Sequence, residues 1–111
     1  MIAEQLDSYV KACMNTWLLC EVGIHTEEKK LFPKEKLLRA YRNCAQACLS
    51  VASQFISNPL YMDKKVSSCV HYCRECYNEC MLHDEEEIEY CGEACSNCAE
   101  KIQGLLALQL N

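Results

Sequence analysis

Residues 69–80 read Cys69-Val-His-Tyr-Cys73-Arg-Glu-Cys76-Tyr-Asn-Glu-Cys80, so that successive cysteines lie four, three and four positions apart. An α-helix turns by about 100° per residue, which brings all four side chains within about 40° of one direction. Each residue adds about 1.5 Å along the axis, so the row of thiols is about 16 Å long. The spacing therefore predicts a helix with one face made of thiols.

Cysteines at similar intervals occur in three further segments of the chain. These cysteines are Cys13 and Cys20, Cys44 and Cys48, and Cys91, Cys95 and Cys98. Apolar residues continue each series at steps of three or four, which is typical of the buried face of a bundle helix. The sequence thus predicts four amphipathic helices that carry cysteine where an ordinary bundle carries leucine.

Glycine and proline mark the first two predicted helices. Gly23 can end a first helix that spans residues 2–22, because glycine is common just past a helix C-terminus. Pro33 can occupy the first turn of a second helix, where its missing N–H costs nothing. That helix is predicted to continue to about Ser57.

The other two helices are predicted from capping signals. Asn58 and Pro59 fit the N-cap and the first position of a third helix. Asp84 and Glu87 fit a capping box for a fourth helix that continues to Leu110. Short connections between four helices of similar length favour an antiparallel up-down-up-down bundle. We therefore predict an all-α four-helix bundle with a cysteine-lined core, formed by residues 1–111 as a single domain.

The composition indicates the cellular compartment of the protein and excludes some kinds of binding partner. Eleven of the 111 residues are cysteine, and the formal net charge is −5. Thiols on successive turns of one helix are poor disulfide partners, and the chain does not open with an apolar leader, which predicts reduced thiols in the cytoplasm. The negative charge argues against nucleic acid, whose phosphates require clustered lysine and arginine. No apolar stretch approaches the roughly 20 residues of a membrane span, so no membrane partner is expected.

Facing rows of thiolates indicate a soft metal ion, and Cu(I) fits them best. Thiolates select Cu(I), Zn(II) and Fe–S clusters among the common metals. Cu(I) accepts two or three thiolates, and one thiolate can bridge two ions, so a continuous row can hold several ions. Zn(II) prefers a closed tetrahedral set, and the usual ferredoxin runs end in Cys-Pro, which this chain lacks. An Fe–S electron-transfer protein and a thiol redox sensor are the alternatives. No constellation of catalytic residues is recognisable, so no enzymatic activity is predicted.

Two histidines and two methionines lie near the cysteines. His83, near the predicted end of the third helix, follows Cys80 by three residues, and His25 follows the first helix. The two helix ends meet in an up-down bundle, so we expect both histidines as metal ligands at one end. Met14 and Met81 each lie one residue past a cysteine, about 100° off the thiol face, and are expected to pack or to be partly exposed.

Antiparallel pairing predicts that the thiols share one half of the bundle. Cys76 should lie level with Cys95, and Cys73 level with both Cys98 and Cys44. Metal should then enter at the end that carries Cys20, Cys80 and His83, and Trp17 should pack inside the bundle between Cys13 and Cys20. The residues predicted to fill the far half are Leu6, Val10, Val51, Phe55, Val66, Ile102 and Leu106.

Residues 67–101, SSCVHYCRECYNECMLHDEEEIEYCGEACSNCAEK, resemble the cysteine-rich four-helix-bundle copper storage proteins, in particular their cytosolic branch. The resemblance lies in a C-x3-C-x2-C-x3-C helix, a C-x2-H step from Cys80 to His83, and a following C-x3-C-x2-C helix. Residues 43–48, Asn-Cys-Ala-Gln-Ala-Cys, resemble the second helix of that family. The resemblance implies storage of many Cu(I) ions inside the bundle and assembly into a tetramer. The candidate ligands are Cys13, Cys20, Cys44, Cys48, Cys69, Cys73, Cys76, Cys80, Cys91, Cys95, Cys98, His83 and His25.

Overall fold

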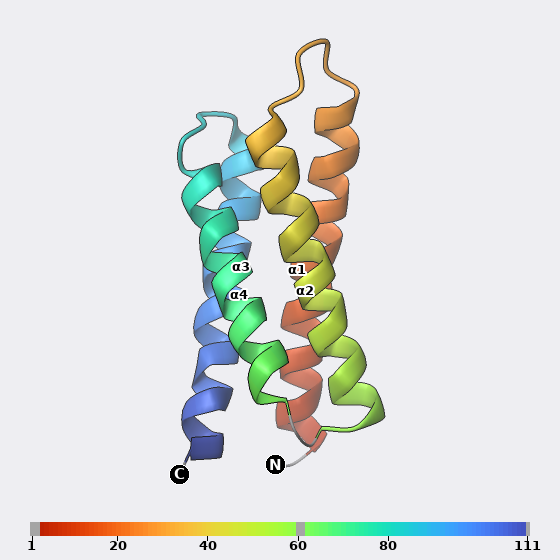
Figure 1. Cartoon of the computed structure of the whole chain (residues 1–111), viewed down its shortest axis with the longest axis vertical. Coiled ribbons are helices and arrows are strands. Elements are labelled where there is room, and N and C mark those ends of the chain that lie inside the picture. Colours follow the sequence, from red (N-terminus) through yellow and green to blue (C-terminus); the bar gives the residue numbers. More distant parts are fainter. Residues whose placement is uncertain (1–2, 60–61, 111) are drawn as a thin grey trace.

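The computed structural model describes the backbone of residues 3–59 and 62–110, and the side chains of residues 6–59 and 62–105. Within these residues the chain forms four helices, which are α1 (Ala3–Glu28), α2 (Glu35–Ser57), α3 (Asp63–Cys80) and α4 (Glu86–Leu110). Each helix packs against the next, and α4 closes the bundle against α1. The helices alternate in direction (Figure 1). The predicted up-down-up-down bundle with buried cysteines is therefore confirmed.

The loops divide the bundle into two distinguishable ends. The α1–α2 connection, residues 29–34, and the α3–α4 connection, residues 81–85, lie side by side at the upper end in Figure 1. We call this the double-loop end. The start of α1, the end of α2, the start of α3 and the end of α4 lie at the opposite, far end (Figure 1).

Apolar side chains fill the half of the bundle nearest the far end, as predicted. Tyr9 stacks on Phe55 with ring centroids 5.7 Å apart, and Leu6 and Val10 pack half-buried against the same core. The buried residues of this half are Val51, Ala52, Phe55, Met62, Val66, Ala99, Ile102 and Leu105. Burying one such large side chain stabilises the fold by about 1.5–3 kcal/mol. The side chain of Leu106 lies outside the described residues.

Helix α1 continues past Gly23 to Glu28, so its predicted end near residue 22 was wrong. Gly23 has a packing role in place of a capping role. A Cβ atom at this position would lie 2.7 Å from Cε2 of Tyr41, closer than side chains tolerate. The missing side chain lets the buried Tyr41 ring of α2 lie directly against the α1 backbone.

The buried carboxylate of Glu27 ties the end of α1 to the start of α2. Its Oε1 accepts a hydrogen bond of 2.9 Å from the Lys34 backbone N–H, and its Oε2 lies 2.8 Å from Lys30 Nζ. Burial opposes ionisation of Glu27, but these hydrogen bonds and the lysine charges outweigh it and lower the pKa. Helix α2 then begins at Glu35, two residues after Pro33, which was predicted to lie in the first turn of this helix.

Helix α3 begins later and ends earlier than predicted. Asn58 does not start it, because Asn58 has extended backbone angles and its N–H donates to the Gln54 carbonyl at the C-terminus of α2. The helix runs from Asp63 to Cys80, which leaves His83 in the following loop.

The predicted capping box of α4 is also shifted. The helix begins at Glu86, and the Glu85 carbonyl accepts hydrogen bonds from the backbone N–H groups of Ile88 and Glu89. Glu85 therefore occupies the N-cap position that was predicted for Asp84. The acidic residues that follow in the first turn stabilise the positive end of the helix dipole.

Candidate metal centre

Eight of the cysteines form two compact groups of four sulfur atoms. Within each group, all sulfur atoms lie within 4.8 Å of one another. The four-helix group takes one cysteine from every helix and consists of Cys20, Cys44, Cys76 and Cys95. The three-helix group consists of Cys48, Cys69, Cys73 and Cys98. All eight are buried, so each group presents its thiols to the others in the group and not to water.

The two groups are continuous with each other along the bundle axis. Cys44 Sγ of the four-helix group lies 3.6 Å from Cys73 Sγ of the three-helix group. Cys44 Sγ also lies 3.7 Å from Cys95 Sγ, and Cys48 Sγ lies 3.8 Å from Cys69 Sγ. These distances confirm the predicted pairing of helix levels, because antiparallel helices with thiols every three or four residues meet turn by turn.

The remaining three cysteines extend the groups in both directions. Cys91 Sγ lies 3.9 Å from Cys20 Sγ, on the side toward the double-loop end. The Cys80 thiol forms hydrogen bonds with the thiols of Cys76 and Cys91. The Cys13 thiol forms hydrogen bonds with those of Cys69 and Cys98 at the opposite side. All eleven thiols are free and buried, and together they form one file of sulfur atoms, which we call the thiol file.

Hydrogen bonds between the thiols set which sulfur ionises first. Hydrogen bonds from Cys20, Cys48 and neighbouring thiols hold the pKa of Cys44 well below its ordinary value. Hydrogen bonding with Cys20, Cys44 and other neighbours raises the pKa of Cys76. The thiols of the metal-free file cannot ionise together, because one negative charge opposes the next. A bound cation removes that restriction and lets adjacent sulfurs ionise together.

The sulfur spacing fits ions held directly between thiolates. A tetrahedral Zn(II) ion with bonds of about 2.3 Å would hold its sulfurs about 3.8 Å apart, so one four-sulfur group matches zinc by distance. Zinc would leave Cys13, Cys80 and Cys91 without a role, whereas bridging Cu(I) ions can use the whole file. Sulfurs this close leave no room for the iron–sulfide core that an Fe–S cluster places among its cysteines.

The two candidate histidines lie apart from the four-sulfur groups. His83 lies in the α3–α4 loop, where its backbone N–H donates a hydrogen bond of 3.1 Å to the Cys80 carbonyl oxygen. Its Nε2 is buried, lies 3.7 Å from Glu79 Oε1, and has no hydrogen-bond partner among the described residues. His25 is exposed on α1. The structure therefore places His83 in the loop just after Cys80, with its ring near Glu79, and leaves His25 in solvent.

Apolar side chains cover much of the thiol file at the double-loop end, and entry of metal beside Cys20, Cys80 and His83 stays a prediction. Leu37 and Tyr41 precede Cys44 on α2, Ile88 precedes Cys91 on α4, and all three are buried. Tyr41 lies level with the outermost thiols, close to Cys80 and Cys91, and Ile88 lies one turn before Cys91. Leu37 and Tyr41 precede Cys44 by seven and three residues, which places them on the buried face of α2. This spacing does not reveal that they cover thiols at this end of the bundle.

Thr16, and not Trp17, occupies the buried position between Cys13 and Cys20. Thr16 is 1% exposed, and its hydroxyl donates to the Ala12 carbonyl over 2.9 Å. Trp17 is only half-buried at the edge of the core, so its predicted place inside the bundle was wrong. The seven residues from Cys13 to Cys20 divide equally well at Thr16, after three, and at Trp17, after four. Threonine can occupy the buried position because its hydroxyl forms a hydrogen bond within its own helix.

The fold and the thiol file define a class of protein, a helical bundle that stores metal in its core. The chain matches the family model described as copper storage protein over residues 2–107, and it belongs to this family. The protein accordingly stores copper as multiple Cu(I) ions bound by cysteine, and its function is storage and not catalysis.

A curated relative is also described as rich in cysteine. The chain is 26% identical over 108 residues to a Bacillus subtilis (strain 168) protein named "Uncharacterized cysteine-rich protein YhjQ", covering 92% of this chain and 100% of the relative. No solved structure matches the chain significantly. Among the helices in residues 3–59 and 62–110, none combines the length and the apolar character needed to cross a membrane.

Proposed function

We propose that this protein buffers the cytoplasmic copper supply by holding several Cu(I) ions along the thiol file, with all eleven cysteines as ligands. The observation that carries the proposal is the continuity of the file, in which the two four-sulfur groups meet at 3.6 Å between Cys44 Sγ and Cys73 Sγ. Sulfurs at this distance can share ions. A site for one structural ion would need only four of the eleven thiols.

Anaerobic titration with Cu(I) against a chromophoric chelator tests the proposal. We expect a stoichiometry well above four and up to about eleven ions per chain, because each thiolate that bridges two ions lets the ion count approach the sulfur count. The loaded protein should be colourless with strong ultraviolet charge-transfer absorption. Saturation at a single ion, or a brown protein with visible absorption, would contradict storage of Cu(I).

Serine variants assign the ligands. Cys73→Ser, which removes a sulfur between the two groups, should lower the number of bound Cu(I) ions. We propose His83 as a further ligand beside Cys80, and His83→Ala should then lower the stoichiometry by at most about one ion. His25→Ala is the matched control, because His25 is exposed and should leave the stoichiometry unchanged. A loss with His25→Ala equal to that with His83→Ala would contradict this assignment.

Cytoplasmic location is supported by the chemistry of the file. Eleven free thiols at distances of 3.6–3.9 Å stay available for metal only in a reducing compartment. Fractionation of the cells that produce the protein, followed by thiol counting under denaturing conditions, tests this proposal. Disulfide-linked protein outside the cytoplasm would contradict it.

We also propose that residues 1–111 act as one domain and that copies of it assemble into a tetramer. Exposed apolar side chains support assembly, since Leu31, Phe32, Ile56 and Leu82 are between 73% and 86% exposed. Such residues are unusual on a protein that stays monomeric when they gather into patches. Sedimentation equilibrium of the reduced protein should give four times the chain mass, and a monomer at micromolar concentration would contradict the proposal.

A further inference from the structure

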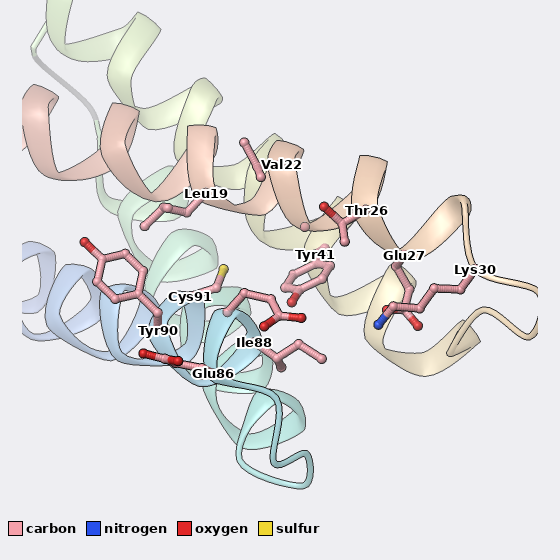
Figure 2. A pocket seen from close by; sticks show the side chains of 12 residues that line it. Leu19, Val22, Thr26, Glu27, Lys30, Tyr41, Glu86, Ile88, Tyr90 and Cys91 are labelled. Atoms are coloured by element: carbon pink, nitrogen blue, oxygen red, sulfur yellow. The ribbon is translucent and has the colours of Figure 1, made fainter.

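A pocket of about 390 Å³ opens between α1 and α4 near the double-loop end, where Thr26, Tyr41 and Ile88 form part of its wall. Leu19 and Val22 of α1 line it on one side, and Tyr90 and Cys91 of α4 line it on the other. Figure 2 shows Cys91 pointing from α4 toward the space between the helices, with Leu19 across from Tyr90. A thiol of the file therefore forms part of the wall of a surface pocket.

The exposure of the cysteines singles out the same face. Cys91 is 3% exposed and Cys98 is 2% exposed, whereas the other nine cysteines are 0% exposed. Cys98 lines a second, neighbouring pocket of about 240 Å³, and Tyr90 belongs to the walls of both pockets. Both points at which the thiol file reaches the surface thus lie on α4 and face α1.

From Cys91 the file leads inward without a gap. Cys91 Sγ lies 3.9 Å from Cys20 Sγ, and Cys20 is a member of the four-helix group. The four-helix group in turn meets the three-helix group at Cys44 and Cys73. An ion bound at Cys91 therefore has the next sulfur within reach at every step.

Away from this pocket, the double-loop end offers no comparable path, although Tyr41 and Ile88 also belong to the pocket wall. Leu37, Tyr41 and Ile88 are each at most 3% exposed and cover the thiols on that side. Gly92 brings α4 so close to the end of α3 that a Cβ atom there would lie 2.8 Å from Cys80 Cβ and 2.9 Å from Met81 Cε. Cys80 is therefore sealed by close packing, although it is the last thiol of its helix.

We propose that Cu(I) reaches the thiol file through the α1–α4 pocket, delivered as a complex with a small thiol, and that Cys91 is its first acceptor. The pocket volume lies in the range of about 300–1,000 Å³ that small-molecule sites occupy. Glu86, Glu87 and the ion pair of Glu27 with Lys30 also line the pocket, so its charged lining is negative on balance and favours a neutral or cationic complex over an anionic one. The inference rests on the proposed storage of Cu(I).

The transfer is a ligand exchange without a redox step. The Cys91 sulfur forms a bond to Cu(I), and the bond between Cu(I) and the carrier sulfur breaks. The proton of the Cys91 thiol passes to the released carrier thiolate, which leaves as a neutral thiol. Copper stays Cu(I) throughout, and the same exchange then passes it from Cys91 to Cys20.

Stopped-flow uptake from a Cu(I)–dithiothreitol complex tests the path. Leu19→Trp and Thr26→Trp place a large ring in the pocket wall and should each slow uptake at least about tenfold without changing the final stoichiometry. Leu49→Trp is the matched control, because Leu49 is 42% exposed on α2 and outside this pocket. Wild-type rates in both pocket variants would overturn the proposal while leaving storage intact. Failure of the wild type to bind Cu(I) would instead overturn the proposed function.

Alkylation of the reduced, metal-free protein gives a readout that does not depend on copper. Brief treatment with iodoacetamide, followed by peptide mass spectrometry, should label Cys91 before the other cysteines at the double-loop end, and Leu19→Trp should slow this labelling. Leu49→Trp should leave the order of labelling unchanged, because Leu49 lies outside the pocket. Labelling of Cys80 or Cys20 first would place the path at the end of the bundle and overturn the proposal.

Discussion

Single residues, more than the overall pattern, decide how the helices of this protein meet. Glu27 is the clearest case, because one carboxylate accepts the Lys34 backbone N–H and pairs with the ammonium groups of Lys30 and Lys34. It takes the place of a side-chain cap, which Lys34 itself does not supply at the start of α2. A charge that is 2% exposed is favourable here only because each oxygen has a cationic or N–H partner.

Glu27→Gln should lower the free energy of unfolding by about 1–2 kcal/mol at pH 7, because the amide makes weaker hydrogen bonds than the carboxylate. The pKa of Glu27 is lower in the folded protein than the ordinary value of 4.5. Its contribution is therefore present above pH 4.5 and disappears as the pH falls through the folded pKa. Urea unfolding of the reduced, metal-free variant and wild type at pH 7 and at pH 3 measures both effects.

The matched control for this prediction is Glu28→Gln. Glu28 is 53% exposed and lies 3.5 Å from Arg42, so its loss should cost less than about 0.5 kcal/mol. Equal effects of the two substitutions, or a Glu27 effect that persists undiminished at pH 3, would contradict the role assigned to the buried carboxylate.

Thr16→Cys should add a ligand to the thiol file and raise the Cu(I) stoichiometry by about one ion. Thr16 is buried between Cys13 and Cys20, so a sulfur there would face the interior. Trp17→Cys is the control, since Trp17 lies half-buried at the edge of the core. The chelator titration described above measures both variants, and a gain with Trp17→Cys alone would show that the opposite side of α1 faces the metal.

At the scale of the helices, close approach between backbones depends on glycine. Gly23→Ala should destabilise the protein by about 1–3 kcal/mol, because the new Cβ overlaps the Tyr41 ring, which is buried and cannot move aside. This cost exceeds the gain of about 1 kcal/mol that alanine brings to a helix interior. Thermal unfolding followed by circular dichroism measures the change.

Gly104→Ala is the matched control and should have the opposite sign. A Cβ atom at position 104 meets nothing within 4 Å, so only the helix-propensity gain of up to about 1 kcal/mol remains. If both alanine variants raise the melting temperature, the contact between Gly23 and Tyr41 does not shape the α1–α2 interface.

The sequence was a good guide to the thiol levels and a poor guide to the helix ends. Intervals such as those between Cys69, Cys73 and Cys76 fix a helical face, and antiparallel topology then fixes which thiols meet. Helix ends depend on tertiary partners that spacing does not reveal. Gly23 was predicted to end a helix because its role is set by Tyr41, which lies 18 residues later in the sequence.

The burial of the cysteines was predictable, but the packing of the residues around them was not. The residues that cover the double-loop end were visible as apolar positions, yet their effect depends on α2 and α4 coming together there. Similarly, the spacing from Cys13 to Cys20 allows either Thr16 or Trp17 to be buried. Packing against α4 decides for Thr16, whose Oγ1 lies 3.5 Å from the Ala94 carbonyl oxygen. Which face of the bundle is hollowed cannot be derived from periodicity.

For the whole molecule, the structure separates folding from metal binding. The half toward the far end contains the large apolar side chains, so the reduced protein should be helical and cooperatively folded without metal, unlike a zinc finger. Phe55→Ala should lower the free energy of unfolding of the metal-free protein by about 3–5 kcal/mol, because it leaves a cavity under the Tyr9 ring.

Ile56→Ala controls for the loss of an apolar side chain from the same turn. Ile56 is 73% exposed, so its removal should change the unfolding free energy by less than about 0.5 kcal/mol. Urea unfolding followed by circular dichroism measures both variants. A metal-free protein with a random-coil spectrum, or equal effects at the two positions, would show that the apolar half does not hold the bundle.

The buried, protonated state of the thiol file has a consequence for how the rest of the cell perceives this protein. Each Cu(I) that binds displaces one proton when ions and thiols are equal in number, so the formal net charge of −5 is the same in the empty and the full molecule. The exchange takes place beneath the helices, and the isoelectric point and the external electric field stay constant. A partner that must distinguish a full copy from an empty one therefore cannot do so by charge, and has to respond to mass, rigidity or the copper itself.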